Sequence, residues 1–357
     1  MRRHRAVRVA LGATLLLTIT LVVSLPVQAA ARCFGRQATI VGTNDVDTIN
    51  GTGGADVIVT GEGADRINGR GGNDLICSGR GRDRVRGQAG SDRINGGTSG
   101  DVLLAGEGND VVVGGQGAEF VAGANGNDSM KMGTGADFMI GGAGNDRYLG
   151  GPSLQDIASF ENSGAGVVVD LGLPTAQNTN EGTDVITGTE GVIGSAYDDR
   201  LTGLNIASEF GDLLAGLEGT DQLVGLDGND FIVGGLGSDK GAPAPGSLSG
   251  GFGNDIVVGD EPEAFLEGAG DDDLFGDAGD DFLDGGGNVS GPPAGDVGNG
   301  GTHVVGDECT GLETATECER FLRDTRTTFA MAAAQLAVED HMEWWMGAAR
   351  GRVGSSG

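Results

Sequence analysis

Residues 141–149 read GGAGNDRYL, and residues 106–114 read GEGNDVVVG. The same spacing of glycine, aspartate and an apolar side chain divides residues 42–149 into twelve consecutive nonapeptides without insertion or deletion. The repeats begin at Gly42, Gly51, Thr60, Gly69, Ser78, Gly87, Gly96, Ala105, Gly114, Gly123, Met132 and Gly141.

Three positions of the repeat keep their character. The sixth is acidic: Asp47, Asp56, Asp65, Asp74, Asp83, Asp92, Asp101, Asp110, Glu119, Asp128, Asp137 and Asp146. The eighth is apolar or aromatic: Ile49, Ile58, Ile67, Ile76, Val85, Ile94, Leu103, Val112, Val121, Met130, Met139 and Tyr148. The fourth is glycine except at Asp45 and Ser99.

Each position has a physical meaning. Glycines at positions one, two and four permit the positive φ angles of a tight turn and leave carbonyl oxygens unshielded. Positions seven to nine predict a three-residue strand with one apolar side chain pointing inward. A disordered acidic linker would not keep an apolar residue at every eighth position. The repeat therefore predicts an all-β chain in which turns and short strands alternate.

The charge of the chain indicates its partner. It carries 52 acidic against 22 basic side chains, a net charge of −30, with 72 glycines. Such acidity excludes nucleic acid and anionic membrane surfaces as main partners, because both would repel the chain. Carboxylates of stacked turns would lie about 5 Å apart and repel, and a divalent cation between them reverses that sign. Carboxylate and carbonyl oxygens favour calcium over magnesium or zinc, so we expect several calcium ions and a disordered chain without them.

These nonapeptides, with GLDGNDFIVGG at 225–235, resemble the RTX, or hemolysin-type, calcium-binding repeat family. The resemblance implies a right-handed parallel β-roll, a β-solenoid with two repeats per turn, in which position-six aspartates hold calcium between neighbouring loops. The expected metal ligands are Asp47, Asp56, Asp65, Asp74, Asp83, Asp92, Asp101, Asp110, Asp128, Asp137, Asp146, Asp199, Asp212, Asp221, Asp230, Asp239, Asp255, Asp272 and Asp281. Expected carbonyl ligands lie near Gly54, Gly63, Gly72, Gly108, Gly126, Gly135, Gly144 and Gly228.

The repeats form two blocks. The first, with an N-terminal cap, covers 32–149, and residues 150–193 break the period. That spacer contains strand-like runs at Asp156 to Phe160, Gly166 to Leu171 and Asp184 to Thr187. We expect it to continue the solenoid; a separate binding site is the alternative.

The second block, 194–284, is less regular. Four extra residues lie between Asp199 and Asp212, and Lys240 to Gly246 interrupts a repeat whose strand resumes at Ser247. Such insertions should loop out on one side. Ala264 replaces a position-six aspartate, and its repeat should lack one calcium ion.

Residues 1–31 are typical of a secretory signal peptide. Arginines at the start precede an apolar run from Ala10 to Leu25 and the small residues Ala29, Ala30 and Ala31. The run is short and broken by threonines, so a membrane anchor is the weaker interpretation, and we expect no membrane span in the mature chain. The sequence therefore predicts a secreted, extracellular or surface protein.

Four cysteines would enter an oxidising compartment: Cys33, Cys77, Cys309 and Cys318. Disulfides are favoured over zinc, because no Cys-x-x-Cys spacing is present. We expect Cys33 to pair with Cys77 beside the first repeats, and Cys309 with Cys318 in a C-terminal cap spanning 285–320. Both pairs would cover an open end of the solenoid.

Residues 321–357 form a tail. Met331, Val338, Met342 and Trp345 fall on one stripe, which predicts a short C-terminal helix over 319–349. A capping helix is favoured over a docking site for a partner or membrane.

The sequence does not favour an enzyme. Only His303 and His341 follow the leader, and neither an H-E-x-x-H nor a G-x-S-x-G motif occurs. We expect a calcium-binding protein with a structural or adhesive role outside the cell. The alternatives are a secreted hydrolase that carries such repeats, or a module that binds a polyanionic glycan or wall polymer. In the last case, Arg66, Arg84 and Arg86 would form the basic outer face.

Overall fold

The computed structural model describes residues 31–152, 155–206, 211–237, 247–252, 256–258, 273–278, 282–284, 297–299, 308–310 and 314–316. Throughout these residues the regular structure is β-strand, and most strands pair in parallel with a later turn of the same coil. The predicted parallel β-solenoid is therefore confirmed. No helix long and apolar enough to cross a membrane occurs in this part of the chain. The signal peptide and the C-terminal helix lie outside the described residues.

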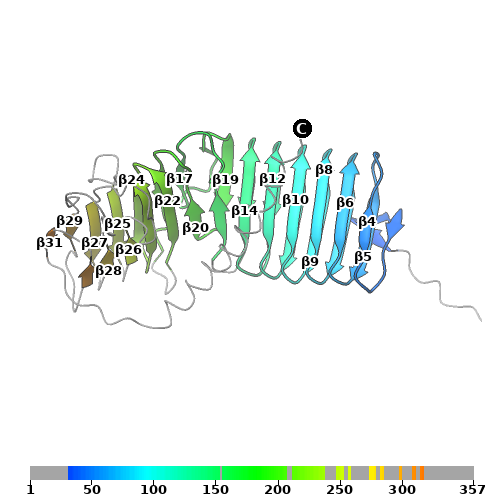
Figure 1. Ribbon diagram of the computed structural model, residues 1–357, viewed down its shortest axis with the longest axis horizontal. Helices are drawn as coiled ribbons and strands as arrows, with labels where there is room; N and C mark the ends of the chain where they lie inside the picture. Colours follow the sequence, from blue (N-terminus) through cyan, green and yellow to red (C-terminus); the bar gives the residue numbers. More distant parts are fainter. Residues whose placement is uncertain are drawn as a thin grey trace, which may run out of the picture. The chain divides into compact units, whose positions relative to one another are not determined.

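One face of the solenoid is a continuous 13-stranded sheet (Figure 1). Its strands are β4 (Thr48–Asn50), β6 (Arg66–Gly71), β8 (Arg84–Ala89), β10 (Val102–Glu107), β12 (Phe120–Asn125), β14 (Phe138–Ala143), β16 (Ile157–Ser159), β20 (Gly191–Ile193), β22 (Leu213–Gly219), β24 (Phe231–Gly237), β26 (Ile256–Val258), β28 (Phe282–Asp284) and β30 (Glu308–Thr310).

The opposite face consists of two sheets. The nine-stranded sheet contains β3 (Ile40–Val41), β5 (Val57–Glu62), β7 (Leu75–Arg80), β9 (Arg93–Thr98), β11 (Val111–Gln116), β13 (Ser129–Lys131), β15 (Arg147–Leu149), β19 (Thr183–Thr187) and β18 (Gln177–Asn178). The seven-stranded sheet contains β17 (Val168–Asp170), β21 (Arg200–Thr202), β23 (Gln222–Asp227), β25 (Ser247–Phe252), β27 (Asp273–Ala278), β29 (Val297–Asn299) and β31 (Thr314–Thr316).

The register shows that two nonapeptides make one turn of the coil. Val102 lies opposite Phe120 and Arg84, each 18 residues away. Insertions change this separation without breaking the pairing, since Gln222 lies opposite Ser247 across the interruption at 240–246. The prediction that the strand resumes at Ser247 is therefore confirmed.

The strands are longer than the sequence predicts. A typical strand such as β5 has six residues, which are positions seven to nine of one repeat and one to three of the next. The prediction of a three-residue strand is wrong for most repeats of the first block, because backbone pairing between coils needs no side chain and continues through the first glycines; it holds for β4, β13 and β15. The positive φ angles at position two, such as 123° at Gly106, occur inside the strand. Position four, such as Gly108 with φ of 134°, begins the tight turn.

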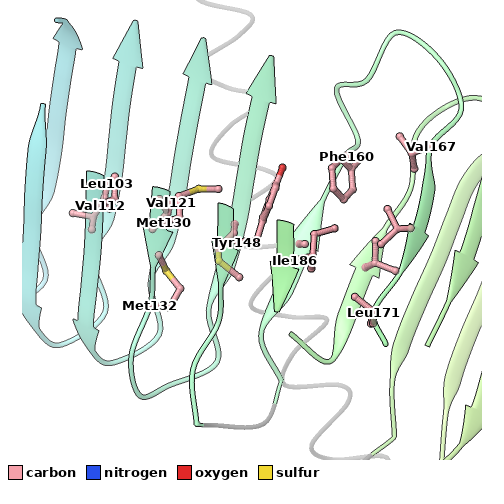
Figure 2. Close-up of a cluster of buried hydrophobic side chains, with 14 of the residues drawn as sticks. Leu103, Val112, Val121, Met130, Met132, Tyr148, Phe160, Val167, Leu171 and Ile186 are labelled. Carbon is pink, nitrogen blue, oxygen red and sulfur yellow. The ribbon is translucent and has the colours of Figure 1, made fainter. Parts of the chain in front are cut away.

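The core is narrow and lies between the two faces. The eighth-position side chains from Ile58 to Tyr148 are at most 3 % exposed. Position one also points inward, and Met132 fills this place at 2 % exposure. Figure 2 shows the middle of this column, where Val121 and Met130 from opposite sheets meet and Tyr148 follows. The apolar column predicted from the repeat is thus the core.

The spacer at 150–193 continues the coil and connects the two repeat blocks. After β16 the chain forms β17, the first strand of the seven-stranded sheet, and then returns through β18 to β19, the last parallel strand of the nine-stranded sheet. β18 pairs antiparallel with β19 and covers that sheet's edge. Gln177 accepts a hydrogen bond from Asp170 N at 2.7 Å and donates to Asp170 O at 2.8 Å, which covers the edge of β17. The spacer is therefore part of the solenoid.

A small hairpin lies at the first repeats. β1 (Arg32–Cys33) pairs antiparallel with β2 (Arg36–Gln37). Cys33 is disulfide-bonded to Cys77, with the two Cα atoms 5.7 Å apart, and the Arg93 guanidinium lies 4.6 Å from the centre of the Phe34 ring. The predicted Cys33–Cys77 pair is confirmed. Cys309 lies in β30, but Cys318 and most of the cap at 285–320 lie outside the described residues, so the predicted Cys309–Cys318 pair stays a prediction.

Candidate calcium centres

The position-six aspartates form two ladders that run along the loops of the solenoid. In each step, the backbone N–H of one aspartate donates to Oδ1 of the aspartate in the next turn, as from Asp92 to Asp110 at 2.6 Å and from Asp110 to Asp128 at 2.8 Å. The same bond joins Asp65 to Asp83 in the other ladder at 2.8 Å. Each carboxylate is thereby fixed over the preceding turn.

A separate ladder of hydrogen bonds is formed by the asparagines at position five, directly before the aspartates. Asn127 N donates to Asn109 Oδ1 at 2.8 Å, and Asn145 N donates to Asn127 Oδ1 at 2.8 Å. These bonds run in the opposite direction to those of the aspartates. Adjacent loops are therefore joined in both directions, and the position-five asparagines were a missed structural element whose signal is the recurring Asn-Asp pair.

The second oxygen of most position-six carboxylates has no hydrogen-bond partner. The buried Oδ2 atoms without one belong to Asp65, Asp74, Asp83, Asp92, Asp101, Asp110, Asp128, Asp137, Asp146 and Asp156. Their residues are at most 1 % exposed. A buried, unpaired carboxylate oxygen is strongly unfavourable unless a proton or a cation accompanies it. The ladders thus present a row of oxygens that the chain itself does not satisfy.

The position-four glycines bring carbonyl oxygens close to the next turn. A Cβ placed on Gly126 would lie 1.8 Å from Gly108 O, and one on Gly144 would lie 1.7 Å from Gly126 O. Seven of the eight carbonyl positions predicted from the sequence have φ between 102° and 150°. Gly54 is the exception, and its oxygen accepts a hydrogen bond from Thr52 Oγ1 at 3.2 Å. Only glycine leaves room here for the closely stacked carbonyls.

Three acidic residues of the spacer extend the ladders and were missed. Asp137 N donates to Asp156 Oδ1 at 3.0 Å, and Asp146 N donates to Asp184 Oδ1 at 2.6 Å. Asp156 N in turn donates to Glu190 Oε2 at 3.1 Å. The available signal was an acidic residue two places before a buried apolar one, as in Asp184-Val185-Ile186.

The repeats that form these ladders match a known family. A model of the RTX calcium-binding nonapeptide repeat matches residues 41–76, 78–103, 95–130, 133–152, 206–240, 247–261 and 268–288, just over half of the chain. The chain belongs to the RTX calcium-binding repeat family. No curated protein matches the chain.

The oxygen atoms that this RTX roll offers as metal ligands suit calcium. The described residues contain no cluster of three or more His, Cys, Asp or Glu side chains able to hold a metal, so a site must combine one or two carboxylates with carbonyl oxygens. Calcium accepts six to eight such oxygens in flexible geometry. The unsatisfied Oδ2 atoms and the stacked position-four carbonyls provide this type of ligand. Bound calcium would supply the positive charge that the buried carboxylates lack.

The pKa values of the RTX ladder show the consequence of burial without a cation. Burial raises the pKa of Asp110 to about 6, and that of Asp146 to about 7. Glu119, the one glutamate at position six of the first block, has its pKa raised to about 9 by burial first and then by Asp137. Near pH 7 Glu119 therefore favours a proton, whereas Asp110 is mostly ionised at a cost in folding free energy that a bound cation would offset.

The remaining predicted ligands divide into three groups. Asp199, Asp212, Asp221 and Asp230 are buried in the second block, where Asp199 N donates to Asp221 Oδ1 at 2.8 Å and Asp212 N to Asp230 Oδ1 at 2.7 Å. Asp47 and Asp56 begin the ladders, and their Oδ2 atoms accept backbone N–H groups of Thr43 and Thr52. Asp239, Asp255, Asp272, Asp281 and the degenerate copy at Ala264 lie outside the described residues.

Proposed function

We propose that this RTX protein is an exported structural or adhesive roll whose folding is coupled to calcium binding. The row of buried Oδ2 atoms without hydrogen-bond partners carries the proposal. These oxygens come together only when the turns stack, so the sites do not exist in the unfolded chain. Calcium that binds the stacked loops therefore stabilises the folded state directly.

Export is supported by the chemistry of the N-terminal region. The described part contains the Cys33–Cys77 disulfide, and such bonds persist in oxidising compartments. The arginine-containing start and apolar run of residues 1–31 fit a secretory leader. Extracellular calcium sites bind at about 0.1 to 1 mM, so folding would follow export.

We also propose a role without catalysis. The described acidic side chains with strongly raised pKa values are almost all ladder residues, such as Asp101 and Asp156, and the ladder accounts for their burial. An acid with a raised pKa is a candidate catalyst only when its structural role does not explain the shift.

The test is a calcium titration of the purified chain followed by far-UV circular dichroism. In excess chelator we expect a disordered spectrum, and with millimolar calcium a cooperative gain of β structure. Magnesium at the same concentration is the control, because its preference for a rigid octahedral shell suits these sites poorly. A chelated protein with the full β spectrum, unchanged by calcium, would contradict the proposal.

A polyanionic glycan or wall polymer is a second proposed partner. Arg66 and Arg84 lie opposite each other on β6 and β8, and Arg86 lies one outward position further along β8. The pKa of Arg84 is lowered by burial first and then by Arg86 and Arg66, which shows how closely the three charges lie. Retention on an anionic resin that Arg86→Glu abolishes supports this partner; equal retention of Arg86→Glu and wild type would exclude it.

A further inference from the structure

The first loops of the two repeat blocks differ from the other loops at position two of the repeat. In nine of the ten later repeats of the first block this position has a positive φ, such as 79° at Gln88. Thr43, Thr52 and Ser195 hold position two at the start of the two blocks and do not adopt a positive φ. Threonine is β-branched, and a positive φ is especially unfavourable for such a residue. The strands β3, β4 and β20 accordingly end two residues before these three positions.

A hydroxyl group lies inside each of these three loops. In the second repeat, Thr52 N donates to Asp56 Oδ2 at 2.6 Å, and the Thr52 hydroxyl lies 2.9 Å from the same oxygen. That hydroxyl accepts the Gly54 N–H at 3.2 Å and lies 3.2 Å from Gly54 O. It is therefore placed between the position-six carboxylate and the position-four carbonyl, the two kinds of oxygen that would hold calcium in other loops. We call this arrangement the hydroxyl cap.

The first repeat has the same cap, and both capped loops begin a ladder. Thr43 N donates to Asp47 Oδ2 at 2.7 Å. The Thr43 hydroxyl donates to that oxygen at 3.0 Å and accepts the Asp45 N–H at 3.1 Å. β3 and β4 are the terminal strands of their sheets, so no earlier turn of the described roll stacks on these loops. A calcium ion shared between two turns would find only one turn here.

The third cap begins the second block. Ser195 N donates to Asp199 Oδ2 at 2.5 Å, and the Ser195 hydroxyl donates to Asp199 Oδ1 at 2.9 Å. The hydroxyl also accepts the Tyr197 N–H at 3.1 Å. Asp199 Oδ1 accepts the N–H of Val167 in the spacer at 2.6 Å, where a regular ladder would supply the N–H of an aspartate. The cap thus occurs again where a ladder has no preceding carboxylate loop.

We propose that the hydroxyl cap replaces calcium at Asp47, Asp56 and Asp199, so that each block starts from loops that bind no metal. This reassignment of three expected ligands rests on the proposed function, in which calcium binds the remaining ladder carboxylates. A buried carboxylate that accepts N–H and O–H donors is satisfied without a cation. Asp65 and Asp74, in the next turn of the first block, have no hydrogen-bond partner for Oδ2 and are the first carboxylates that need calcium.

The capped loops also position the first calcium-binding turn. Asp56 N donates to Asp74 Oδ1 at 2.8 Å, and Asp199 N donates to Asp221 Oδ1 at 2.8 Å. Each cap fixes its own aspartate, and the backbone of that aspartate fixes the next carboxylate of the ladder. A turn without metal therefore serves as the template on which the first calcium-binding turn stacks.

The calcium content of two neighbouring variants tests the assignment. Asp56→Asn changes a capped carboxylate, and Asp74→Asn makes the same change at the next position of the same ladder. Equilibrium dialysis of the full chain at saturating calcium should give the wild-type content for Asp56→Asn and a loss of bound calcium for Asp74→Asn. Far-UV circular dichroism checks that each roll is folded. If Asp74→Asn does not fold, Asp92→Asn, at the following position of the ladder, takes its place.

The outcomes separate this proposal from the proposed function. Equal calcium loss in Asp56→Asn and Asp74→Asn would overturn the assignment of the cap and leave the proposed function standing. Wild-type content in both variants would overturn the proposed function and the assignment together. Asp199→Asn should also keep the wild-type content, and a loss of calcium there would overturn the assignment for the second block.

Removal of one hydroxyl tests how the cap acts. Thr52→Val keeps the shape of the side chain but removes the hydroxyl that lies beside Asp56 Oδ2. Amide hydrogen exchange of the calcium-loaded protein should become faster in residues 51–56, while the calcium content stays at the wild-type value. Thr48→Val, at an exposed position of β4, is the matched control and should exchange like wild type. Equal exchange of residues 51–56 in both variants would overturn the role of the hydroxyl.

Discussion

Replacement of Asp110 by asparagine should have opposite effects with and without calcium. Asp110 lies in the middle of its ladder, is 1 % exposed, and accepts the Asp92 N–H through Oδ1 at 2.6 Å. Its Oδ2 has no hydrogen-bond partner. Asparagine keeps the accepting oxygen and the shape of the side chain, but it removes the charge that calcium would neutralise.

The magnitude follows from the pKa of Asp110. Burial, opposed by the Asp92 hydrogen bond and reinforced by Asp128, raises it from 3.8 to about 6. About two pKa units correspond to about 3 kcal/mol. Because the folded chain binds the proton more tightly, this stability is present below about pH 3.8 and is lost as the pH rises through about 6. Without calcium at pH 7.5, Asp110→Asn should therefore fold more readily than wild type, by up to about 3 kcal/mol.

Far-UV circular dichroism in excess chelator, from pH 8 to pH 4, measures this effect. Wild type should gain β structure on acidification, and Asp110→Asn should begin that gain at higher pH. In calcium at pH 7.5 the order reverses, and the variant should need more calcium. Glu107→Gln, an exposed position of the same repeat, makes the same charge change and is the control. If both variants fold alike in chelator, or if wild type loses β structure on acidification, the argument from buried carboxylates fails.

Three further changes test other parts of the roll. Gln88→Gly should stabilise the calcium-loaded protein by about 1 kcal/mol in urea unfolding, because Gln88 has φ of 79°; an unchanged midpoint would show that this position is not strained. Gln177→Ala removes two hydrogen bonds to Asp170 and should cost about 1 to 3 kcal/mol, with hydrogen exchange fastest in β17; uniform exchange would contradict its edge-covering role. A Cys33→Ser/Cys77→Ser variant opens a closed loop of 44 residues and should lower stability by about 2 to 4 kcal/mol, measured against wild type with and without reductant; equal stability would refute the cap.

The periodic part of the fold was predictable because each position of the repeat has one physical task. Position eight, as at Leu103, points inward, and position six, as at Asp101, lies on the loop ladder. Strand length was not predictable from the same pattern. The glycine-rich residues at positions one to three, as in Gly114-Gly115-Gln116, look like turn residues, yet they pair with neighbouring coils through backbone alone.

The spacer shows where a periodic argument ends. Asp156 and Asp184 continue the two ladders, but 19 and 38 residues separate them from the preceding members instead of 18. Across this break each turn still contacts the next one, although the number of residues per turn varies. Gly182 illustrates this, since a Cβ on it would lie against Gly144 O as in a regular repeat. A search for Gly-x-Asp before an apolar pair, as in Gly182-Thr183-Asp184-Val185-Ile186, would therefore find Asp184, which a fixed nine-residue frame misses, but not Asp156, which follows Leu154-Gln155.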